Sequence, residues 1–553
     1  MPIEGVTPFP PEIARYYREQ GYWQDRPLRD HFRDWTRAHR ERIAICYPVV
    51  RTYAELDARA SRLACHLLGL GLGPRSRVVV QLPNVPEFVE LYFALQYIGA
   101  TPLMALPAHR EHEIGHYVEF VEAEAYAVPA RFGRFDFLRF ARGIKAGSEH
   151  LRHVLVAGEA PGADGFVSIG DLVGTEPPLG TEALDDIDID PDDPCIFQLS
   201  GGTTGTPKVI PRSHNDYACN SHLSGLMNDI RPDDVLLVAA PAGHNFPLAS
   251  PGIQGFLERG ASVALSNSTS ASACLPIIEK AGVTHLEIVP AMMIGWLNDP
   301  IISCYDLSSV RVVNSGGQKY QRATKLRTEA AFSNAKVQEV FGMAEGLLMM
   351  TRLDDPEEVR LETVGRPVCS DDEVLLVDSN GEVVSEGEVG ELICRGPYTL
   401  RGYFKAPEVN ARSFTPEGFY VTGDVLRLLP SGNYVVEGRK KDLVNRGGEK
   451  ISTEEVEDIL LAHEAVAMVA CVPMPDPVLG ERMCAFVVAR RQPPPSLEEL
   501  TAFLSERGIA QFKHPERLEF LEELPLSPFG KVQKNLLAAR IADKVAAEST
   551  PGT

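Results

Sequence analysis

The chain has 553 residues, of which 44% are apolar and 24% charged, and 76 acidic against 54 basic residues give a net charge of −22. This length exceeds what one hydrophobic core usually serves, so we expect two or more lobes. The negative charge argues against nucleic acid or an anionic membrane as a partner, because neither attracts a strongly acidic surface.

The cysteines and the start of the chain indicate the cellular compartment. The ten cysteines are scattered and none forms a C-x-x-C pair, so we expect reduced packing residues instead of a disulfide set or a zinc site. The first residues lack the pattern of a signal peptide, and no apolar run is long enough to span a bilayer. We therefore expect a soluble cytoplasmic protein.

The first half of the chain alternates between helical and strand patterns. Apolar residues recur at helical spacing over 53–70, a buried strand is predicted over 77–82, and a helix with proline in its first turn over 86–98. Further strand patterns follow at 261–265 and 283–290. This alternation predicts a layered α/β architecture.

From about residue 374 the pattern changes to short strands separated by turns. Apolar runs at 374–378 and 391–394 flank Asn380-Gly381, which is a hairpin signal. The polar run 439–442 then separates two strand patterns and predicts a domain boundary, which leaves a small domain beyond it. We expect the tail after Asp543 to be disordered.

The most informative stretch is a loop rich in glycine, threonine and serine that ends in lysine. Its glycines let the backbone approach a ligand, and its hydroxyls and lysine suit phosphate oxygens. It is not a Walker A motif, because Thr206 and Pro207 separate Gly205 from Lys208. A flexible polar surface turn is the alternative interpretation.

With five further stretches in the same order, this loop resembles the phosphate loop of the adenylate-forming superfamily, and most closely that of its aryl-acid AMP ligases. The further stretches are 341–346, 420–424, 438–442, 445–450 and 525–534. The resemblance implies an α/β fold. A large N-terminal domain, 1–440, would contain layered α/β subdomains and a β-rich subdomain, and 441–553 would form a small mobile α+β domain.

The resemblance also implies an ATP site. Phe341 would lie against adenine, and Asp424 would accept hydrogen bonds from both ribose hydroxyls. Arg439 would contact the ribose or a phosphate. Glu345 would help to hold Mg²⁺ on the phosphates, because a hard cation prefers carboxylate oxygen. Alanine at 344 replaces the usual threonine. The expected ATP-binding residues are Ser200, Gly201, Gly202, Thr203, Thr204, Gly205, Lys208, Gly316, Gly317, Phe341, Gly342, Met343, Ala344, Asp424 and Arg439.

By the same resemblance, the C-terminal domain supplies a catalytic lysine. Lys531 would bridge the substrate carboxylate and the α-phosphate, a role that suits a compact charge on a flexible stem. After the adenylate forms, the domain would turn about the hinge residue Lys441 and remove Lys531 from the site. The acceptor would be the phosphopantetheine thiol of an aryl carrier protein.

Residues 242–252 resemble the acid-binding segment of aryl-acid AMP ligases. Asn245 would hydrogen-bond the ortho-hydroxyl and carboxylate of the aromatic acid, and Phe246 would pack on its ring. His244 occupies the position of a gate residue and is counted with Lys531 and Glu345 as catalytic. A turn-forming asparagine and a core histidine are the alternative interpretations.

Four more residues are expected to contact the acid, namely Ser250, Gln318, Val340 and Leu348. Ser250 matches dihydroxybenzoate enzymes, whereas Leu348 is the salicylate-like residue and would crowd a 3-hydroxyl. Gln318 replaces the usual alanine, and a buried amide needs a partner such as an amine, a ring nitrogen or a hydroxyl. We expect salicylate first and 2,3-dihydroxybenzoate next, with anthranilate-type and 3-hydroxypicolinate-type acids still open.

Two other functions fit the sequence. An aryl-CoA ligase shares the first step but uses free coenzyme A. A non-catalytic nucleotide-binding regulator would keep the fold, but retention of the key charged residues argues against it. For a carrier protein, which is commonly acidic, we expect a basic docking surface near Arg490, Arg491, Lys513 and Arg517.

Overall fold

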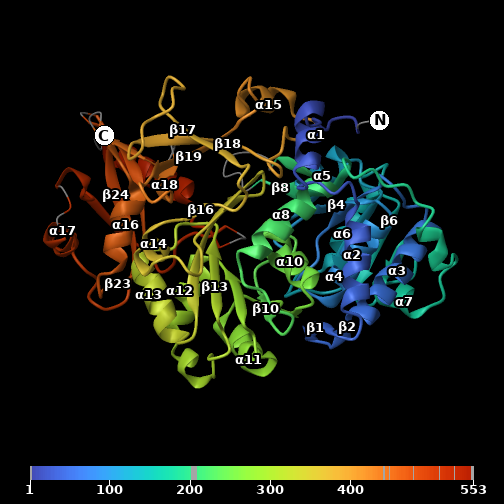
Figure 1. Cartoon of the computed structure of the whole chain (residues 1–553). Coiled ribbons are helices and arrows are strands. Elements are labelled where there is room, and N and C mark those ends of the chain that lie inside the picture. The colour runs from blue at the N-terminus through green and yellow to red at the C-terminus, as the bar shows by residue number, and fades with distance from the viewer. Residues whose placement is uncertain are drawn as a thin grey trace.

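The computed structural model describes residues 3–200, 208–439, 443–446, 449–477, 479–507, 509, 511–527 and 530–549. Figure 1 shows the N-terminal elements in blue and green on one side, the yellow elements in the middle, and the orange and red C-terminal elements on the other side. Four sheets organise the described residues.

The first lobe is built on a sheet with the strand order β7-β6-β5-β3-β4-β8-β9. Its strands pair in parallel, except for the antiparallel β8–β9 pair. Helices α3 and α4 and strand β3 confirm the three elements predicted between residues 53 and 98. The elements are α3 (Tyr53–Gly69), β3 (Arg77–Val80), α4 (Pro86–Tyr97), β4 (Thr101–Met104), α5 (Glu111–Phe120), β5 (Ala125–Pro129), α6 (Phe137–Ala146), β6 (His153–Ala157), β7 (Phe166–Ser168), α7 (Ile169–Gly174), β8 (Pro194–Leu199) and β9 (Val209–Ser213).

The second lobe carries the sheet β16-β15-β14-β13-β12-β10-β11-β1-β2. Its central strands are parallel, and β2, β15 and β16 are antiparallel to their neighbours. The predicted strands 261–265 and 283–290 are confirmed as β11 and β12. Helix α2 (Leu28–Ala38) lies between the lobes and packs against α3 and α4 as well as α8 and α10. The other elements are α1 (Pro11–Glu19), β1 (Ile43–Tyr47), β2 (Arg51–Thr52), α8 (His214–Leu226), β10 (Val235–Val238), α9 (Asn245–Ala249), α10 (Gly252–Glu258), β11 (Ser262–Leu265), α11 (Ala271–Ala281), β12 (His285–Ile288), α12 (Pro290–Asn298), β13 (Val312–Gly316), α13 (Arg322–Ala331), β14 (Lys336–Met343), β15 (Gly346–Met350), α14 (Glu357–Glu362) and β16 (Arg366–Pro367).

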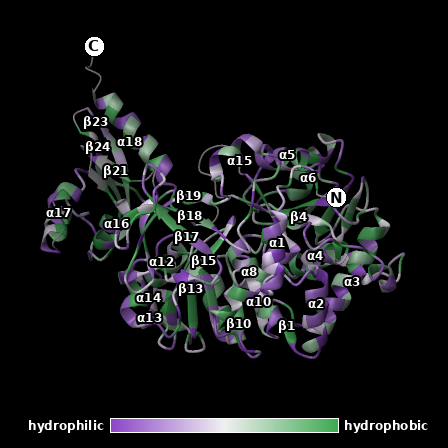
Figure 2. Cartoon of the chain, turned by 45° about the horizontal axis from the view of Figure 1, so that its top comes forward, coloured by the Kyte–Doolittle hydropathy of each residue, from purple (hydrophilic) through white to green (hydrophobic). Residues whose placement is uncertain are grey.

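The two lobes share one apolar core. Leu63 of α3, Leu95 of α4, Leu236 of β10 and Phe256 of α10 are fully buried members of the same cluster. Figure 2 shows the hydrophobic colour on the strands inside and the hydrophilic colour on outer helices such as α2. Burial of this kind is the main favourable term in folding, so the two lobes are expected to unfold together.

An antiparallel sheet, β17-β18-β19-β20, follows and confirms the β-rich texture after residue 374. Its elements are β17 (Glu373–Val377), β18 (Val389–Arg395), α15 (Pro407–Ser413), β19 (Tyr420–Leu428) and β20 (Tyr434–Arg439). Asn380-Gly381 forms the predicted turn, with Gly381 at φ +85°. Across the turn, Val377 and Val383 form an isolated β-bridge. The strand that pairs with β17 along its length is β18, which begins at Val389.

The C-terminal elements form a separate sheet with the order β22-β21-β24-β23, and β25 pairs with β24. They are β21 (Val444–Arg446), β22 (Glu449–Ile451), α16 (Thr453–Leu461), β23 (Val466–Asp476), β24 (Gly480–Ala489), α17 (Leu497–Glu506), β25 (Arg517–Phe520) and α18 (Lys534–Ser549). The expected boundary and the hinge Lys441 lie outside the described residues, so both stay predictions.

The expectation of a disordered tail is wrong for residues 544–549, which belong to α18. Leu537 and Ile541 of this helix are buried against the C-terminal sheet, and Val545 continues the same apolar stripe. These contacts extend the helix beyond the point where its sequence becomes rich in alanine and serine.

All ten cysteines are free thiols, and eight of them are buried. This agrees with the expectation of reduced packing residues. Among the described residues, no helix is both long and apolar enough to cross a membrane.

The carboxyl group of Asp372 is expected to make stability depend on pH. Its Oδ2 accepts a hydrogen bond from Tyr398, and its buried Oδ1 has no partner among the described residues. Burial raises the pKa of this carboxyl to about 8. A carboxyl with a raised folded-state pKa stabilises the fold at low pH, and this contribution is lost as the pH rises from about 4 to about 8.

We therefore expect Asp372→Asn to become more stable relative to the wild type as the pH rises, by on the order of 4 kcal/mol between pH 5 and pH 8. Urea unfolding of both proteins at pH 5, 6.5 and 8 measures this difference. A difference that stays constant over this pH range would contradict the prediction.

Candidate active site

Two glycines at the end of β13 allow other groups to approach closely. A Cβ atom at Gly316 would lie 3.0 Å from the Val340 carbonyl oxygen and 3.6 Å from Cε1 of Phe246. Gly317 has φ +88°, and a Cβ there would lie 3.4 Å from Cε of Lys531. A side chain at 316 would therefore crowd the Val340 carbonyl, and one at 317 would strain the backbone at its positive φ, while the Phe246 ring and Lys531 lie at contact distance.

Lys531 of the C-terminal domain reaches the end of the second-lobe sheet. Its backbone N–H donates to Ser527 Oγ at 3.1 Å, and the Ser527 N–H donates to the Lys531 carbonyl at 2.6 Å, which closes a tight loop. Burial and the nearby Arg439 lower the pKa of Lys531, while Asp424 and Glu345 oppose that shift. The ammonium group thus lies where carboxylates and an arginine converge.

Asp424 and Arg439 form an ion pair across β19 and β20. The two residues are register partners, and Arg439 Nε lies 2.8 Å from Asp424 Oδ1. Burial raises the pKa of Asp424, whereas Arg439 and Lys531 lower it. The structure therefore brings three predicted site residues from two domains together.

Glu345 lies in a small network that the sequence interpretation missed. The hydroxyl of Tyr403 donates to Glu345 Oε1 at 2.8 Å, and the ammonium of Lys208 lies 4.6 Å from the centre of the Tyr403 ring. Tyr403 also exchanges a hydrogen bond with Tyr420 at 2.9 Å. No motif signal marked Tyr403, because only the fold brings it beside Glu345.

The two ends of the expected phosphate loop, Ser200 and Lys208, are held together by two hydrogen bonds. The Ser200 N–H donates to the Lys208 carbonyl at 3.0 Å, and the Lys208 N–H donates to Ser200 Oγ at 3.0 Å. Gly201, Gly202, Thr203, Thr204 and Gly205 lie outside the described residues, so their roles stay predictions.

Strand β14 continues beyond Val340 to Met343, and Ala344 begins the turn that follows. The Ala344 carbonyl accepts a hydrogen bond from Arg212 at 3.0 Å, which fixes the turn before Glu345. Gly342 pairs with Leu348, and a Cβ at Gly342 would lie 2.4 Å from Cδ2 of that leucine. Leu348 therefore packs directly on the β14 backbone.

Asn245, at the start of α9, is buried with an unsatisfied polar atom. Its Nδ2 donates to Ser250 Oγ at 3.1 Å, while its buried Oδ1 has no partner among the described residues. Asn220 also donates to Ser250 Oγ, at 3.2 Å. A buried amide oxygen without a donor is costly, and a ligand hydroxyl or amine would satisfy it.

Three of the remaining residues that are expected to contact the acid form an apolar wall. Val340 and Leu348 are buried in one cluster, and Phe246 packs against it. Gln318 is only half-buried, and its side chain makes no hydrogen bond with the described residues. The expectation that Gln318 narrows the acid site therefore stays untested.

His244 caps α9 and is held in a defined orientation. Its Nδ1 accepts a hydrogen bond from the Phe246 N–H at 3.3 Å. Burial and the charge of Lys531 lower its pKa to about 3. The imidazole is therefore neutral at physiological pH.

An ion pair joins the two domains beside the site. Lys319 Nζ, just after the β13 glycines, lies 2.9 Å from Asp458 of α16. Asp458 and Glu454 raise the pKa of Lys319 against the effect of burial. This pair helps to hold the domain arrangement in which Lys531 is inserted.

Three of the four residues of the expected basic docking surface are paired with carboxylates. Arg491 pairs with Glu499 and Lys513 with Glu455, both at 2.6 Å, and Arg517 pairs with Glu548 at 2.7 Å. These pairs form because the three cations face carboxylates of the same domain. The structure thus does not present these residues as a free positive surface.

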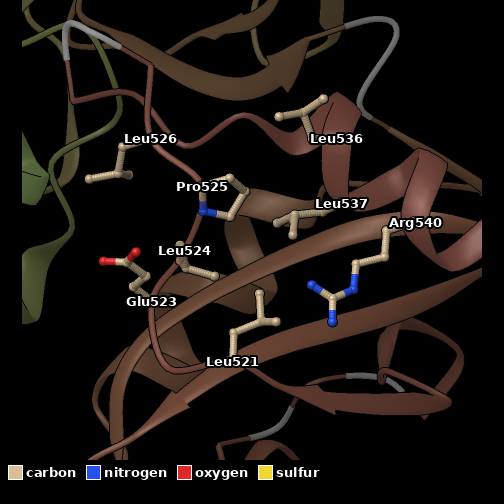
Figure 3. Close-up of a pocket in the computed structure, with 8 residues that line it drawn as sticks. All are labelled: Leu521, Glu523, Leu524, Pro525, Leu526, Leu536, Leu537 and Arg540. Atoms are coloured by element: carbon tan, nitrogen blue, oxygen red, sulfur yellow. The ribbon is translucent and has the colours of Figure 1, made fainter.

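A hollow of about 520 Å³ lies behind the segment that carries Lys531. Figure 3 shows its leucines, with Glu523 and Arg540 on opposite sides. Its lining contains no hydroxyl, thiol or imidazole, so it does not resemble a second reaction site. The lining residues are Leu521, Glu523, Leu524, Pro525, Leu526, Leu536, Leu537 and Arg540.

A large α/β domain with a lysine inserted from a small domain, beside an aspartate–arginine ion pair, is the arrangement of an adenylate-forming ligase. The chain belongs to the AMP-binding enzyme family, whose profile matches residues 32–404. The profile of the AMP-binding enzyme C-terminal domain matches residues 455–531.

Named relatives cover nearly the whole chain. The chain is 44% identical to 2,3-dihydroxybenzoate-AMP ligase of Bacillus subtilis, over 99% of both chains. It is 44% identical to the salicylyl-CoA synthase / salicylate adenylyltransferase of a Streptomyces species, over 97% of this chain and 98% of the relative. It is 41% identical to the salicyl-AMP ligase / salicyl-S-ArCP synthetase of Mycobacterium tuberculosis, over 98% and 95%.

A solved structure has the same fold. The apo structure of MbtA from Mycobacterium smegmatis aligns with a TM-score of 0.73 at 40% identity, and the alignment covers 97% of this chain and 99% of that one.

Proposed function

We propose that this chain is an aryl-acid AMP ligase that activates an ortho-substituted aromatic acid, with salicylate favoured and 2,3-dihydroxybenzoate next. ATP and the acid would give an aryl adenylate and pyrophosphate. The single observation that carries the proposal is the buried, unpartnered Oδ1 of Asn245, which directly follows His244, a residue whose pKa is lowered by burial and by the charge of Lys531. The names of the relatives support the same substrate class.

In the first step, an oxygen of the acid carboxylate attacks the α-phosphorus of ATP and pyrophosphate leaves. Catalysis would come from positioning and charge neutralisation, since no covalent help from the enzyme is required. Lys531 would neutralise the carboxylate and α-phosphate, and Lys208 with the phosphate loop would hold the outer phosphates. Asp424 would orient the ribose, with Arg439 beside it.

The residues around Glu345 fit a magnesium ion bound together with the phosphates. Tyr403 occupies only Oε1 of Glu345, so Oε2 is the oxygen available to a cation. Among the described residues, no three His, Cys, Asp or Glu side chains gather as a metal site, so phosphate oxygens and water would complete the coordination. When bound, Mg²⁺ would neutralise phosphate charge.

We expect Tyr403→Phe to raise the Mg²⁺ concentration needed for half-maximal adenylation about 3- to 10-fold, because Glu345 loses the hydrogen bond that orients it. Pyrophosphate exchange measured over a magnesium series tests this. Tyr398→Phe serves as the control, since Tyr398 bonds Asp372 instead. An unchanged magnesium requirement would remove Tyr403 from this role.

In the second step, we propose that the C-terminal domain turns about Lys441 and admits the phosphopantetheine thiol of an aryl carrier protein. We expect Lys441→Pro to spare adenylation and block thioester formation, because proline fixes the backbone φ angle. Undiminished loading of the carrier would contradict the hinge assignment.

Coenzyme A is the second candidate acceptor, favoured by the name of the Streptomyces relative. Incubating the enzyme, ATP and acid with either coenzyme A or a carrier protein distinguishes the two acceptors by the thioester that forms. The free thiols of the ten cysteines suit a cytoplasmic location for both reactions.

Pyrophosphate–ATP exchange tests the first step. The acids are salicylate, 2,3-dihydroxybenzoate, anthranilate, 3-hydroxypicolinate, benzoate and acetate. We expect exchange only with the ortho-substituted aromatic acids. Exchange with benzoate as strong as with salicylate would leave the ligase family intact but overturn the proposed role of Asn245.

A further inference from the structure

Three buried polar side chains form a row across the second-lobe sheet, and the first step described above uses none of them. Glu287 of β12 is the register partner of Asn314 of β13, which is in turn the partner of Gln338 of β14. Because the strands are parallel neighbours, the three side chains lie on one face at about 4.8 Å strand spacing. We call Glu287, Asn314 and Gln338 the polar row.

Each member of the polar row has an oxygen without a donor. Their side chains are at most 1% exposed, and Glu287 Oε2, Asn314 Oδ1 and Gln338 Oε1 have no hydrogen-bond partner among the described residues. Three adjacent acceptors leave a large unmet demand for hydrogen-bond donors, and buried groups of this kind are normally satisfied.

The orientation of each group follows from its other contacts. Glu287 Oε1 accepts the Gly252 N–H at 3.0 Å. The amide nitrogen of Gln338 donates to the carbonyls of Met227 and Thr351, and that of Asn314 donates to Asn228. Since the amide nitrogens are engaged, the free atoms are the oxygens, and they cannot satisfy one another except through a proton on Glu287.

The polar row lies directly below the candidate acid site. Gly316 and Val340 come two residues after Asn314 and Gln338, so they share the same sheet face about 7 Å further along the strands. Gly316 and Val340 meet the Phe246 ring. Gly252, which binds Glu287, follows Ser250, the partner of Asn245.

We propose that the polar row contacts the aromatic acid itself, and that among salicylates with a further ring substituent it selects those in which this substituent is an amino or hydroxyl group. The inference rests on the proposed function, because it places the ring between Phe246 and Gly316 with the carboxylate towards Lys531. Asn245 would then hydrogen-bond the ortho substituent, and the polar row would accept hydrogen bonds from a second substituent.

The unpartnered oxygens of the polar row require hydrogen-bond donors from whatever group lies against them. A methyl group would leave all three oxygens unpaired, whereas an amino or hydroxyl group of similar size supplies one or two N–H or O–H bonds. Burial raises the pKa of Glu287 to about 8, so its carboxyl can also donate a proton to a neighbouring oxygen or lose it when a donor ligand arrives. An ordered water molecule is the competing occupant.

The experiment compares matched acids in pyrophosphate–ATP exchange with the full chain. Salicylates substituted at ring position 3, 4 or 5 with an amino, hydroxyl or methyl group are ranked by kcat/KM. We expect the amino or hydroxyl acid to exceed the methyl acid at least tenfold at one position. Equal or better values for the methyl acid at every position would overturn the inference and indicate ordered water only.

Two variants connect this preference to the row. Glu287→Leu should remove the preference and improve the methyl acid, while Glu287→Gln, which keeps an acceptor oxygen, should retain part of it. Asp372→Asn is the matched control, because Asp372 is another carboxyl with an unpartnered oxygen and a pKa raised to about 8, outside the row. Its ranking of acids should equal that of the wild type.

The outcomes separate the two proposals. If a folded Glu287→Leu variant keeps the wild-type preference, the assignment of Glu287 is wrong although the ligase activity stands. If the wild type activates no aromatic acid at all, the proposed function fails and the inference fails with it. The order of kcat/KM values that the wild type shows for the substituted salicylates tests the inference even if a variant does not fold.

Discussion

Lys531→Ala is expected to lower the rate of aryl adenylate formation about 100-fold or more, while transfer from preformed adenylate stays within about threefold of the wild type. Lys531 reaches within 3.4 Å of the Cβ position of Gly317 and lies among Asp424, Glu345 and Arg439. Its positive charge would be needed where the carboxylate and α-phosphate meet. Single-turnover assays with acid plus ATP, and with synthetic adenylate plus carrier, measure the two steps separately.

The control for this variant is Lys544→Ala, since Lys544 is a half-exposed lysine of the same domain that forms an ion pair with Glu519, outside the site. Its two rates should equal those of the wild type. If Lys531→Ala lowered the rates of adenylate formation and of transfer equally, the proposal that Lys531 acts only in adenylate formation would be wrong. Retained adenylation would exclude Lys531 from the reaction.

The second large effect is expected from Asn245→Leu, which should reduce kcat/KM for salicylate about 10- to 100-fold and leave benzoate nearly unchanged. The wild-type amide has an unpaired Oδ1 that an ortho-hydroxyl can satisfy, and leucine of similar size offers no polar atom. The ratio of salicylate to benzoate exchange, measured in one preparation, cancels errors in enzyme concentration.

Asn334→Leu is the matched control, because this exposed asparagine precedes β14 and donates to the Ser308 carbonyl, at the opposite end of the strands from Gly316 and Val340. It should keep the wild-type ratio. A salicylate preference that survives in Asn245→Leu would show that another group reads the ortho position, and Ser250 would be the next residue to replace.

Some elements could be predicted because their causes are local in sequence. The helix after Thr52 begins where a capping box forms between Thr52 and Glu55, and its apolar face repeats at helical spacing. The strand at 77–80 is a short run of β-branched residues bounded by turns. The tail was mispredicted because the contact of Val545 with the C-terminal sheet is not local.

The sequence by itself determined the family, the order of its motifs and the kinds of side chain available for the reaction, because glycines, carboxylates and lysines at set spacings carry that information. Only the tertiary structure decided which of them meet. It placed Lys531 beside Gly317, paired Asp424 with Arg439, and brought Tyr403 to Glu345. It also aligned Glu287 with Asn314, since strand register joins residues that are distant in the chain.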